Sequence, residues 1–395
     1  MQISPETQLF IREHQTDDVR ALALQARKYP NVDMPTAITQ IAGRQVAAEK
    51  IPSWRDTDDI WYPKHLSLEQ CSSEVTARYK ATLLKGNSLT DLTGGFGIDC
   101  AFLAARFKSA TYVERQQELC EIAAHNFPIL NLNHINVKNE DGVSYLQAMS
   151  PVDCIFLDPA RRNEHGGKTV AISDCEPDVA ELEELLLNKA GQVMVKLSPM
   201  LDLSLALKEL QHVQEVHIIS ANNECKELLL ILGQASVEEI SIHCVNLPTK
   251  GIQEEQHFVF TREQEQCSEC TYTDSLETYL YEPNASLLKA GAFRSIAAAY
   301  PVRKLHPNSH LYTSDTFIEN FPGRIFRIVN QCSFNKKEVK ENLADLKKAN
   351  VTVRNFPATV AELRKRIHLA EGGDTYLFAS TLNNGQKVLI RCEKV

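Results

Sequence analysis

Apolar and polar positions along residues 88–233 follow the pattern of short strands separated by amphipathic helices. Strands are predicted at 88–92, 110–114, 135–138, 153–157 and 191–197, with helices at 98–107, 116–127, 142–148, 177–188 and 202–209. Two further strands, 214–219 and 226–232, are joined by too few residues for a crossover helix and must form an antiparallel hairpin. The pattern therefore predicts an α/β fold with a doubly wound, mostly parallel sheet.

Helical patterns precede this region and mixed patterns follow it. Residues 1–64 carry helical segments that open near Pro5, Asp17 and Pro35, which predicts an N-terminal helical domain. A small bundle packed on the next domain and an appendage that contacts a substrate or partner both fit this pattern. We expect the α/β domain at 65–235, a β-rich connecting segment at 236–320, and a small α+β domain at 321–395.

Composition places the chain among ordinary globular proteins. Of its 395 residues 43% are hydrophobic and 24% are charged, which excludes a disordered or fibrous class. No run approaches the ~18–20 apolar residues of a membrane span, and residues 1–10 have neither a basic nor an apolar signal region. We therefore expect no membrane partner and a cytoplasmic location, whereas the oligomeric state is not predicted.

The eleven cysteines are scattered and odd in number, as expected of reduced, mostly buried thiols. Cys267 and Cys270 form the only CxxC pair, for which a polar loop, a zinc site or a redox pair are the alternatives. Because no second well-spaced pair accompanies it, we expect no metal site.

Charge is distributed unevenly along the chain. Residues 321–395 hold 14 Lys and Arg against 7 Asp and Glu, a net charge of +7, whereas the whole chain carries −9. Such a basic module could contact RNA phosphates, with Phe326, Phe334 and Phe356 stacking on bases. A solvated helix face over core phenylalanines is the alternative.

A glycine-rich turn follows the first strand of the predicted sheet. The stretch 91–97 reads Asp-Leu-Thr-Gly-Gly-Phe-Gly, and a helical pattern begins at Ile98. Glycines at this place let the backbone turn sharply and let a ligand approach N–H groups at a helix N-terminus. Asp91 would repel a pyrophosphate but suits a ligand that bears an ammonium group.

Acidic residues also end the next three strands. Glu114 lies where a carboxylate can accept hydrogen bonds from both ribose hydroxyls of a nucleoside. Asp141 either caps the helix that follows it or accepts from an adenine amino group, with Gly142 allowing the ring to approach. Asp158 and Pro159 end the fourth strand at the edge where doubly wound sheets bind ligands.

These residues, in this order, resemble the class I S-adenosylmethionine-dependent methyltransferases. The resemblance covers about residues 66–235 and implies the strand order 3-2-1-4-5-7-6 and S-adenosyl-L-methionine as cofactor. It implies cofactor contacts from ten residues: Gln70, Asp91, Thr93, Gly95, Phe96, Gly97, Glu114, Asp141, Gly142 and Asp158. Thr93 stands where many members have glycine. In residues 66–80, Ser72 or Ser73 either caps a helix or lines the ligand pocket.

The fourth motif, Asp158-Pro159-Ala160-Arg161, departs from the Asp-Pro-Pro-Tyr form typical of amino-group methylation of bases and looks closer to some RNA-modifying members. Catalytic roles are implied for Asp158, Pro159 and Arg161, and Arg161 or Arg162 either meets a substrate phosphate or forms a salt bridge. Residues 195–199 offer no cysteine nucleophile, which disfavours C5 methylation of pyrimidines.

The whole chain also resembles a bacterial family of methyltransferases with C-terminal ferredoxin-like and THUMP-like domains. This resemblance rests on residues 70–80, 158–162, 281–283 and 363–366. Because THUMP domains bind RNA, this resemblance implies RNA as the substrate. With C5 methylation disfavoured, we expect methylation of a ring or exocyclic nitrogen of an RNA base. The alternatives are a methyltransferase for a protein or small molecule and a non-catalytic RNA-binding protein with a vestigial methyltransferase fold.

Overall fold

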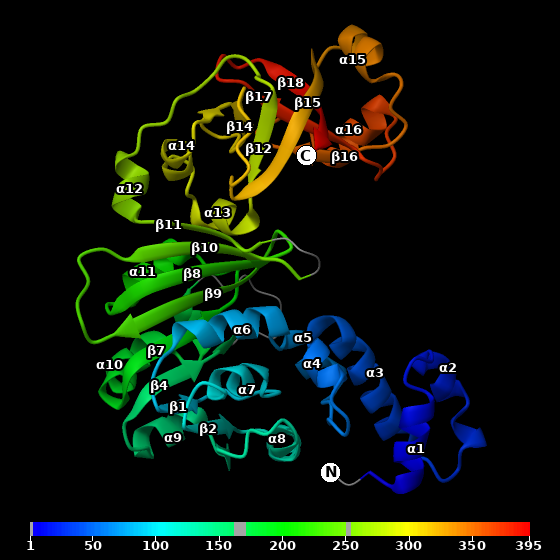
Figure 1. Cartoon of the computed structure of the whole chain (residues 1–395), viewed down its shortest axis with the longest axis vertical. Helices are drawn as coiled ribbons and strands as arrows, with labels where there is room; N and C mark the ends of the chain where they lie inside the picture. Colours follow the sequence, from blue (N-terminus) through cyan, green and yellow to red (C-terminus); the bar gives the residue numbers. More distant parts are fainter. Residues whose placement is uncertain (1–2, 162–170, 250–253) are drawn as a thin grey trace. The chain divides into compact units, whose positions relative to one another are not determined.

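The computed structural model describes residues 3–161, 171–249 and 254–395 (Figure 1). The chain forms two compact units, one made of the residues up to Val216 together with Glu227–Glu238, the other of His217–Lys226 and Glu239–Val395. No helix in these described ranges is both long enough and apolar enough to cross a membrane.

The first unit opens with helices that begin where the sequence predicts: α1 (Pro5–Glu13), α2 (Val19–Leu24) and α3 (Met34–Lys50), followed by α4 (Pro52–Arg55). Side chains of Ser4, Asp18 and Asp33 accept hydrogen bonds from N–H groups of the first turns. The first three helices enclose a small core that includes Phe10 and Ile41.

Nine strands form the larger sheet, in the order β11-β10-β8-β9-β7-β4-β1-β2-β3. Their bounds are β1 (Ser88–Asp91), β2 (Ser109–Glu114), β3 (Ile135–Asn139), β4 (Val152–Leu157), β7 (Ala190–Leu197), β8 (Val213–Ala221), β9 (Glu224–Gly233), β10 (Ser241–Leu247) and β11 (Gln256–Phe260). Strands β7, β8 and β9 are the fifth, sixth and seventh of the predicted order 3-2-1-4-5-7-6, which is confirmed. As predicted, β9 runs antiparallel to β7 while the strands from β7 to β3 are parallel.

The helices of this domain are α5 (His65–Gln70), α6 (Glu74–Leu83), α7 (Ile98–Ala104), α8 (Gln117–Ile129), α9 (Gly142–Ala148), α10 (Val179–Lys189) and α11 (Leu203–Glu209) (Figure 1). Central strands are buried along most of their length, with β4 buried from Cys154 to Leu157 and β7 from Val193 to Leu197. Parallel strands of this kind are covered on both faces, which explains their continuous apolar runs.

The second unit contains a seven-stranded sheet in the order β13-β14-β12-β15-β18-β17-β16. Its strands are β12 (Tyr279–Pro283), β13 (Arg303–Lys304), β14 (Tyr312–Ser314), β15 (Gly323–Ser333), β16 (Asn350–Val353), β17 (Thr375–Thr381) and β18 (Lys387–Lys394). Its helices are α12 (Arg262–Cys267), α13 (Ala285–Ala290), α14 (Ser295–Ala299), α15 (Lys336–Leu343) and α16 (Val360–Ile367). Because β12 pairs with β15, the predicted connecting segment and the predicted C-terminal domain share one sheet.

Part of the basic charge predicted for the C-terminal region is used inside this unit. Glu282 on β12 is buried and forms ion pairs with Arg324 and Arg354. Phe326 is fully buried in the core. Phe334 packs edge-on against Phe356, with the ring centroids 4.9 Å apart. These positions favour core packing over base stacking for the three phenylalanines.

Candidate functional site

The glycine turn after β1 has the conformation that its sequence predicts. Gly95 and Gly97 have φ angles of +53° and +87°, a region that side chains with a Cβ rarely adopt. A Cβ on Gly94 would lie 2.2 Å from the Tyr112 ring, so this position also requires glycine. The Tyr112 hydroxyl donates to the Gly95 carbonyl at 2.5 Å, which fixes the turn against β2.

Asp91 lies at the end of β1 with only 1% of its surface exposed. Its Oδ1 accepts the Thr93 N–H at 3.0 Å, while its Oδ2 is buried and has no hydrogen-bond partner among the described residues. Burial raises the pKa of Asp91 well above its usual value, and the nearby Asp99 and Asp158 raise it further. An incoming cation or hydrogen-bond donor at Oδ2 would offset the burial and favour the ionised carboxylate.

Thr93 links the two halves of the site. Its hydroxyl oxygen accepts the backbone N–H of Asp158 at 2.6 Å. The turn after β1 is therefore tied directly to the turn after β4, with both Asp91 and Asp158 held by the same residue.

Glu114 ends β2 and accepts two backbone hydrogen bonds. Gly95 N–H donates to its Oε2 at 2.9 Å and Gln116 N–H donates to its Oε1 at 2.8 Å. The carboxylate is thus oriented toward the glycine turn, and each oxygen has a second lone pair that could accept from a ligand.

Asp141 is the N-cap of α9, because its Oδ1 accepts the Ser144 N–H at 2.9 Å. The capping interpretation of Asp141 is therefore realised in the structure. At Gly142 a Cβ would lie 2.3 Å from the Leu92 carbonyl oxygen. Gly142 thus lets α9 begin directly against the end of β1.

Asp158 and Pro159 follow β4, as predicted, and Ala160–Arg161 then form the short strand β5, which pairs with β6 (Cys175–Glu176). The Asp158 side chain is 38% exposed, and its Oδ2 lies 2.6 Å from the Lys196 ammonium. Arg162 lies outside the described residues.

A buried cluster of charges lies beside these residues. The Lys80 ammonium, whose side chain has no exposed surface, contacts Glu227 Oε1 at 2.7 Å and Asp99 Oδ1 at 3.0 Å. Lys196 contacts Asp99 Oδ2 at 3.2 Å as well as Asp158. The cluster therefore connects the first turn of α7 with the carboxyl ends of β4 and β7 and with the start of β9.

The two lysines and the buried aspartate stabilise one another's charges. Although burial opposes ionisation, Lys196 and Lys80 lower the pKa of Asp99. Burial likewise disfavours the charged form of Lys196, but Asp158 and Asp99 outweigh it and raise its pKa well above the usual value. Both groups are therefore charged at neutral pH.

The remaining predicted residues lie around this cluster. Ser73 caps α6, whereas the Ser72 hydroxyl donates to Asp99 at 2.7 Å and accepts from Lys80 at 2.8 Å. Gln70 is the exposed last residue of α5. The Phe96 ring is buried and packs edge-on against Trp54 with the ring centroids 5.1 Å apart.

Sequence reasoning missed Lys80, Asp99, Lys196 and Glu227. A signal was present, because Lys196 and Glu227 stand beside or within apolar runs of central strands, where an ionisable residue is rarely tolerated without a partner. The pairing itself could not be read from the sequence, since Lys80 and Glu227 are 147 positions apart.

We expect Lys80→Met to lower the free energy of unfolding by about 3–5 kcal/mol, because two buried carboxylates would lose their shared counter-charge. Urea denaturation near neutral pH measures this. The stabilisation that ionised Asp99 gives the fold is complete above its unfolded pKa of about 3.9 and is lost as the pH falls through its lowered folded pKa. The loss of unfolding free energy caused by Lys80→Met should therefore shrink in acid.

Lys64→Met is the matched control, because the Lys64 side chain is 77% exposed and pairs only at the surface with Glu118. It should cost about 0–1 kcal/mol. Equal costs for the two variants would show that the buried cluster does not depend on Lys80.

Three family models match the chain. A ferredoxin-like domain matches residues 279–322, a THUMP domain-like model matches 323–394, and protein-L-isoaspartate(D-aspartate) O-methyltransferase matches 50–163. None of the curated proteins matches the sequence.

One of the matching solved structures covers nearly the whole chain. The crystal structure of a candidate methyltransferase from Porphyromonas gingivalis W83 is 36% identical, with a TM-score of 0.88 over 98% of this chain and 97% of that chain. Two further matches cover only part of this chain. An rRNA methylase from Streptococcus thermophilus is 14% identical, with a TM-score of 0.31 over 41% of this chain and 96% of that chain. SMU.1697c from Streptococcus mutans, in complex with SAH, is 14% identical, with a TM-score of 0.31 over 40% of this chain and 96% of that chain. By its full-length relative and its C-terminal matches, the chain belongs to the family of class I methyltransferases with C-terminal ferredoxin-like and THUMP-like domains.

Proposed function

We propose that this methyltransferase uses S-adenosyl-L-methionine to methylate a ring or exocyclic nitrogen of an RNA base. The observation that carries the cofactor assignment is the buried Asp91 Oδ2, which has no partner among the described residues and lies beside the glycine turn. A ligand with an ammonium group would supply the missing donor.

The charge around Asp91 supports a cationic ligand over a dinucleotide. Asp99, Asp158 and Glu227 contribute three carboxylates against the two ammonium groups of Lys80 and Lys196, and Asp91 adds a fourth acidic group whose raised pKa a cationic ligand would lower. An excess of acidic groups would repel the pyrophosphate of NAD. The amino group and sulfonium of S-adenosylmethionine are both positive and suit this surrounding.

The other cofactor contacts follow from positions on the same sheet edge. Gly95 and Gly97 keep the turn free of side chains, and Glu114 presents its carboxylate to the ribose hydroxyls. Gly142 is the proposed neighbour of the adenine, where the start of α9 lies against the Leu92 carbonyl. Gln70 and Asp141 remain proposed contacts at the rim, and Phe96 contributes through its backbone and by packing under the turn.

Asp158 is proposed to orient the nitrogen that receives the methyl group. Lys196 binds one of its oxygens, and the side chain is partly exposed. A carboxylate held in this way can accept an N–H of the base and direct the nitrogen lone pair. S-adenosylmethionine supplies an already activated methyl group, so the protein must mainly position the two reactants.

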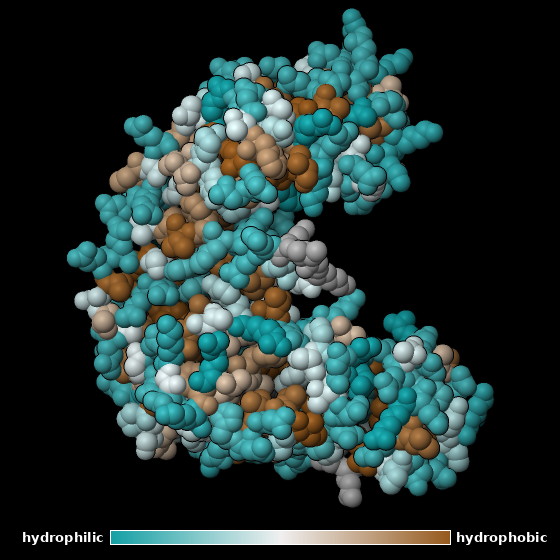
Figure 2. All heavy atoms as spheres, viewed as in Figure 1, coloured by the Kyte–Doolittle hydropathy of each residue, from teal (hydrophilic) through white to brown (hydrophobic). Residues whose placement is uncertain are grey.

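RNA is the substrate class favoured by the THUMP domain-like match at residues 323–394 and by exposed cations on the same domain. Lys336, Lys337 and Lys340 are exposed on α15, and the face shown in Figure 2 is mostly hydrophilic over this helix. A protein substrate is the second candidate, favoured by the match of residues 50–163 to a protein O-methyltransferase model.

Calorimetric titration with S-adenosylmethionine and with NAD tests the cofactor. We expect binding of the first, and Asp91→Asn should weaken it about 10- to 100-fold because a charge-assisted hydrogen bond is lost. Because an ammonium group binds the ionised carboxylate and burial raises the pKa of Asp91 in the free protein, affinity should rise with pH in the wild type and lose this dependence in the variant. Glu118→Gln, at an exposed position, is the control. Tight NAD binding without the methyl donor would contradict the assignment.

Replacing Asp158 separates catalysis from binding. Asp158→Ala should lower the methylation rate about 10²- to 10⁴-fold while the dissociation constant of S-adenosylmethionine changes less. Folding should be retained because Lys196 keeps Asp99 as a partner. Single-turnover transfer of a radiolabelled methyl group measures the rate, with Glu176→Gln, at an exposed carboxylate, as control. Unchanged turnover would remove Asp158 from the reaction.

The substrate class can be tested with the triple variant Lys336→Ala, Lys337→Ala, Lys340→Ala. Deleting residues 321–395 is unsuitable, because β15 lies in the middle of the seven-stranded sheet. We expect weaker RNA binding, a salt dependence whose slope falls by about 0.7 for each lost phosphate contact, and unchanged cofactor affinity. Methyl transfer to total RNA from a deletion strain, followed by nucleoside mass spectrometry, measures the activity. Methylation of protein but not of RNA would favour the second candidate.

A further inference from the structure

Three histidines lie on adjacent strands at one edge of the nine-stranded sheet: His217 on β8, His243 on β10 and His257 on β11. The rings of His217 and His243 stack with centroids 4.4 Å apart, and His243 Nδ1 lies 3.1 Å from His257 Nε2. His217 is buried, His243 is half-buried and His257 is exposed, so the group leads from the sheet to solvent.

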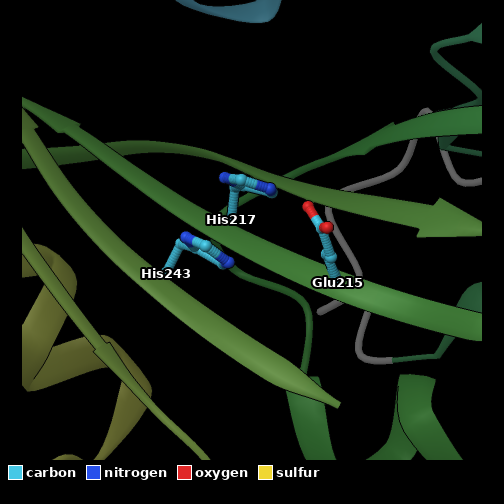
Figure 3. Close-up of side chains that lie close together, drawn as sticks. All are labelled: Glu215, His217 and His243. Atoms are coloured by element: carbon cyan, nitrogen blue, oxygen red, sulfur yellow. The ribbon is translucent and has the colours of Figure 1, made fainter. Parts of the chain in front are cut away.

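A carboxylate joins this group. Glu215 lies two residues before His217 on β8, and residues two apart on a strand share one face. The ligand atoms of Glu215, His217 and His243 all lie within 4.8 Å of one another. Figure 3 shows the carboxylate of Glu215 directed toward the His217 ring. One oxygen and two nitrogen donors are therefore gathered in a small volume.

These donors match a particular class of ions. Imidazole nitrogen and carboxylate oxygen are ligands of Zn²⁺, Co²⁺ and Ni²⁺, whereas Mg²⁺ and Ca²⁺ prefer oxygen ligands alone. In a tetrahedral zinc site the ligand atoms are about 3.3 Å apart, so the present spacing would have to close by about 1.5 Å. Because the rings of His217 and His243 stack with an interplanar angle of 16°, their in-plane nitrogen lone pairs do not converge. One of these rings would therefore have to turn, together with the exposed Glu215 side chain, to bring all three ligand atoms onto one ion.

Neighbouring groups can orient the ligands. The two ring nitrogens of His243 contact Ser241 Oγ and His257 Nε2, each at 3.1 Å. An ion would replace one of these contacts, and the other would then hold the ring, as hydrogen bonds to the second nitrogen do in known metal sites.

We propose that Glu215, His217 and His243 bind one divalent transition-metal ion of the zinc class, with His257 orienting His243. This differs from the expectation of no metal site, which rested on CxxC spacing, whereas these ligands come from strands separated in sequence. The site is independent of the proposed methyl transfer.

Titration of the chelator-treated full-length protein with Zn²⁺ by calorimetry and with Co²⁺ by visible absorption tests the proposal. We expect one ion per chain and an affinity that falls as the pH drops, because histidine ligands must be neutral. His243→Ala should lower the affinity about 100-fold or more, and His257→Ala about 10- to 100-fold. Glu215→Gln should weaken binding without affecting folding, because Glu215 is exposed.

His65→Ala is the control, since His65 is an exposed histidine on α5 and should leave the affinity unchanged. Far-UV circular dichroism checks that each variant is folded. Absence of Co²⁺ uptake, or equal affinity in the wild type, His243→Ala and Glu215→Gln, would overturn the proposal. So would a thiolate-to-cobalt absorption band that Cys267→Ser removes, because the ion would then lie at the CxxC pair.

Discussion

Lys80 and Lys196 both contact the buried Asp99, and each also contacts a second carboxylate. The geometry of the site depends on this cluster of charges. A buried charge without a partner costs several kcal/mol, so Lys80 must stay within contact distance of Asp99 and Glu227, and Lys196 within contact distance of Asp99. Because Lys196 also binds Asp158, this requirement extends to the turn after β4. Thr93 then connects that turn to Asp91 through a single hydrogen bond.

The fold could be predicted further than the site. Strand order and the antiparallel β9 followed from apolar periodicity together with a family resemblance, because parallel strands buried on both faces leave a clear pattern. The charge cluster could not be predicted in the same way, since its partners come from α6, α7, β7 and β9. Lys196 and Glu227, beside or within the apolar runs of β7 and β9, indicated only that partners must exist.

Individual residues show where one sequence allows two roles. Asp141 fits a helix cap and an adenine contact equally well in the sequence, and the structure realises the cap. For Phe326, base stacking and core packing could not be distinguished from composition, whereas full burial on β15 favours packing. In both cases the deciding quantity is tertiary burial or local backbone geometry, which a single sequence does not specify.

The reversed strand of this sheet has a chemical consequence. In its antiparallel register with β7, Leu228 lies opposite Leu197, so the start of β9 meets the carboxyl end of β7. This places Glu227 beside Lys80 at the functional edge. A parallel β9 in the same place would bring its other end, near Gly233, to that edge and leave Lys80 with Asp99 alone. The strand reversal that characterises the sheet is therefore also what supplies the second carboxylate to the buried lysine.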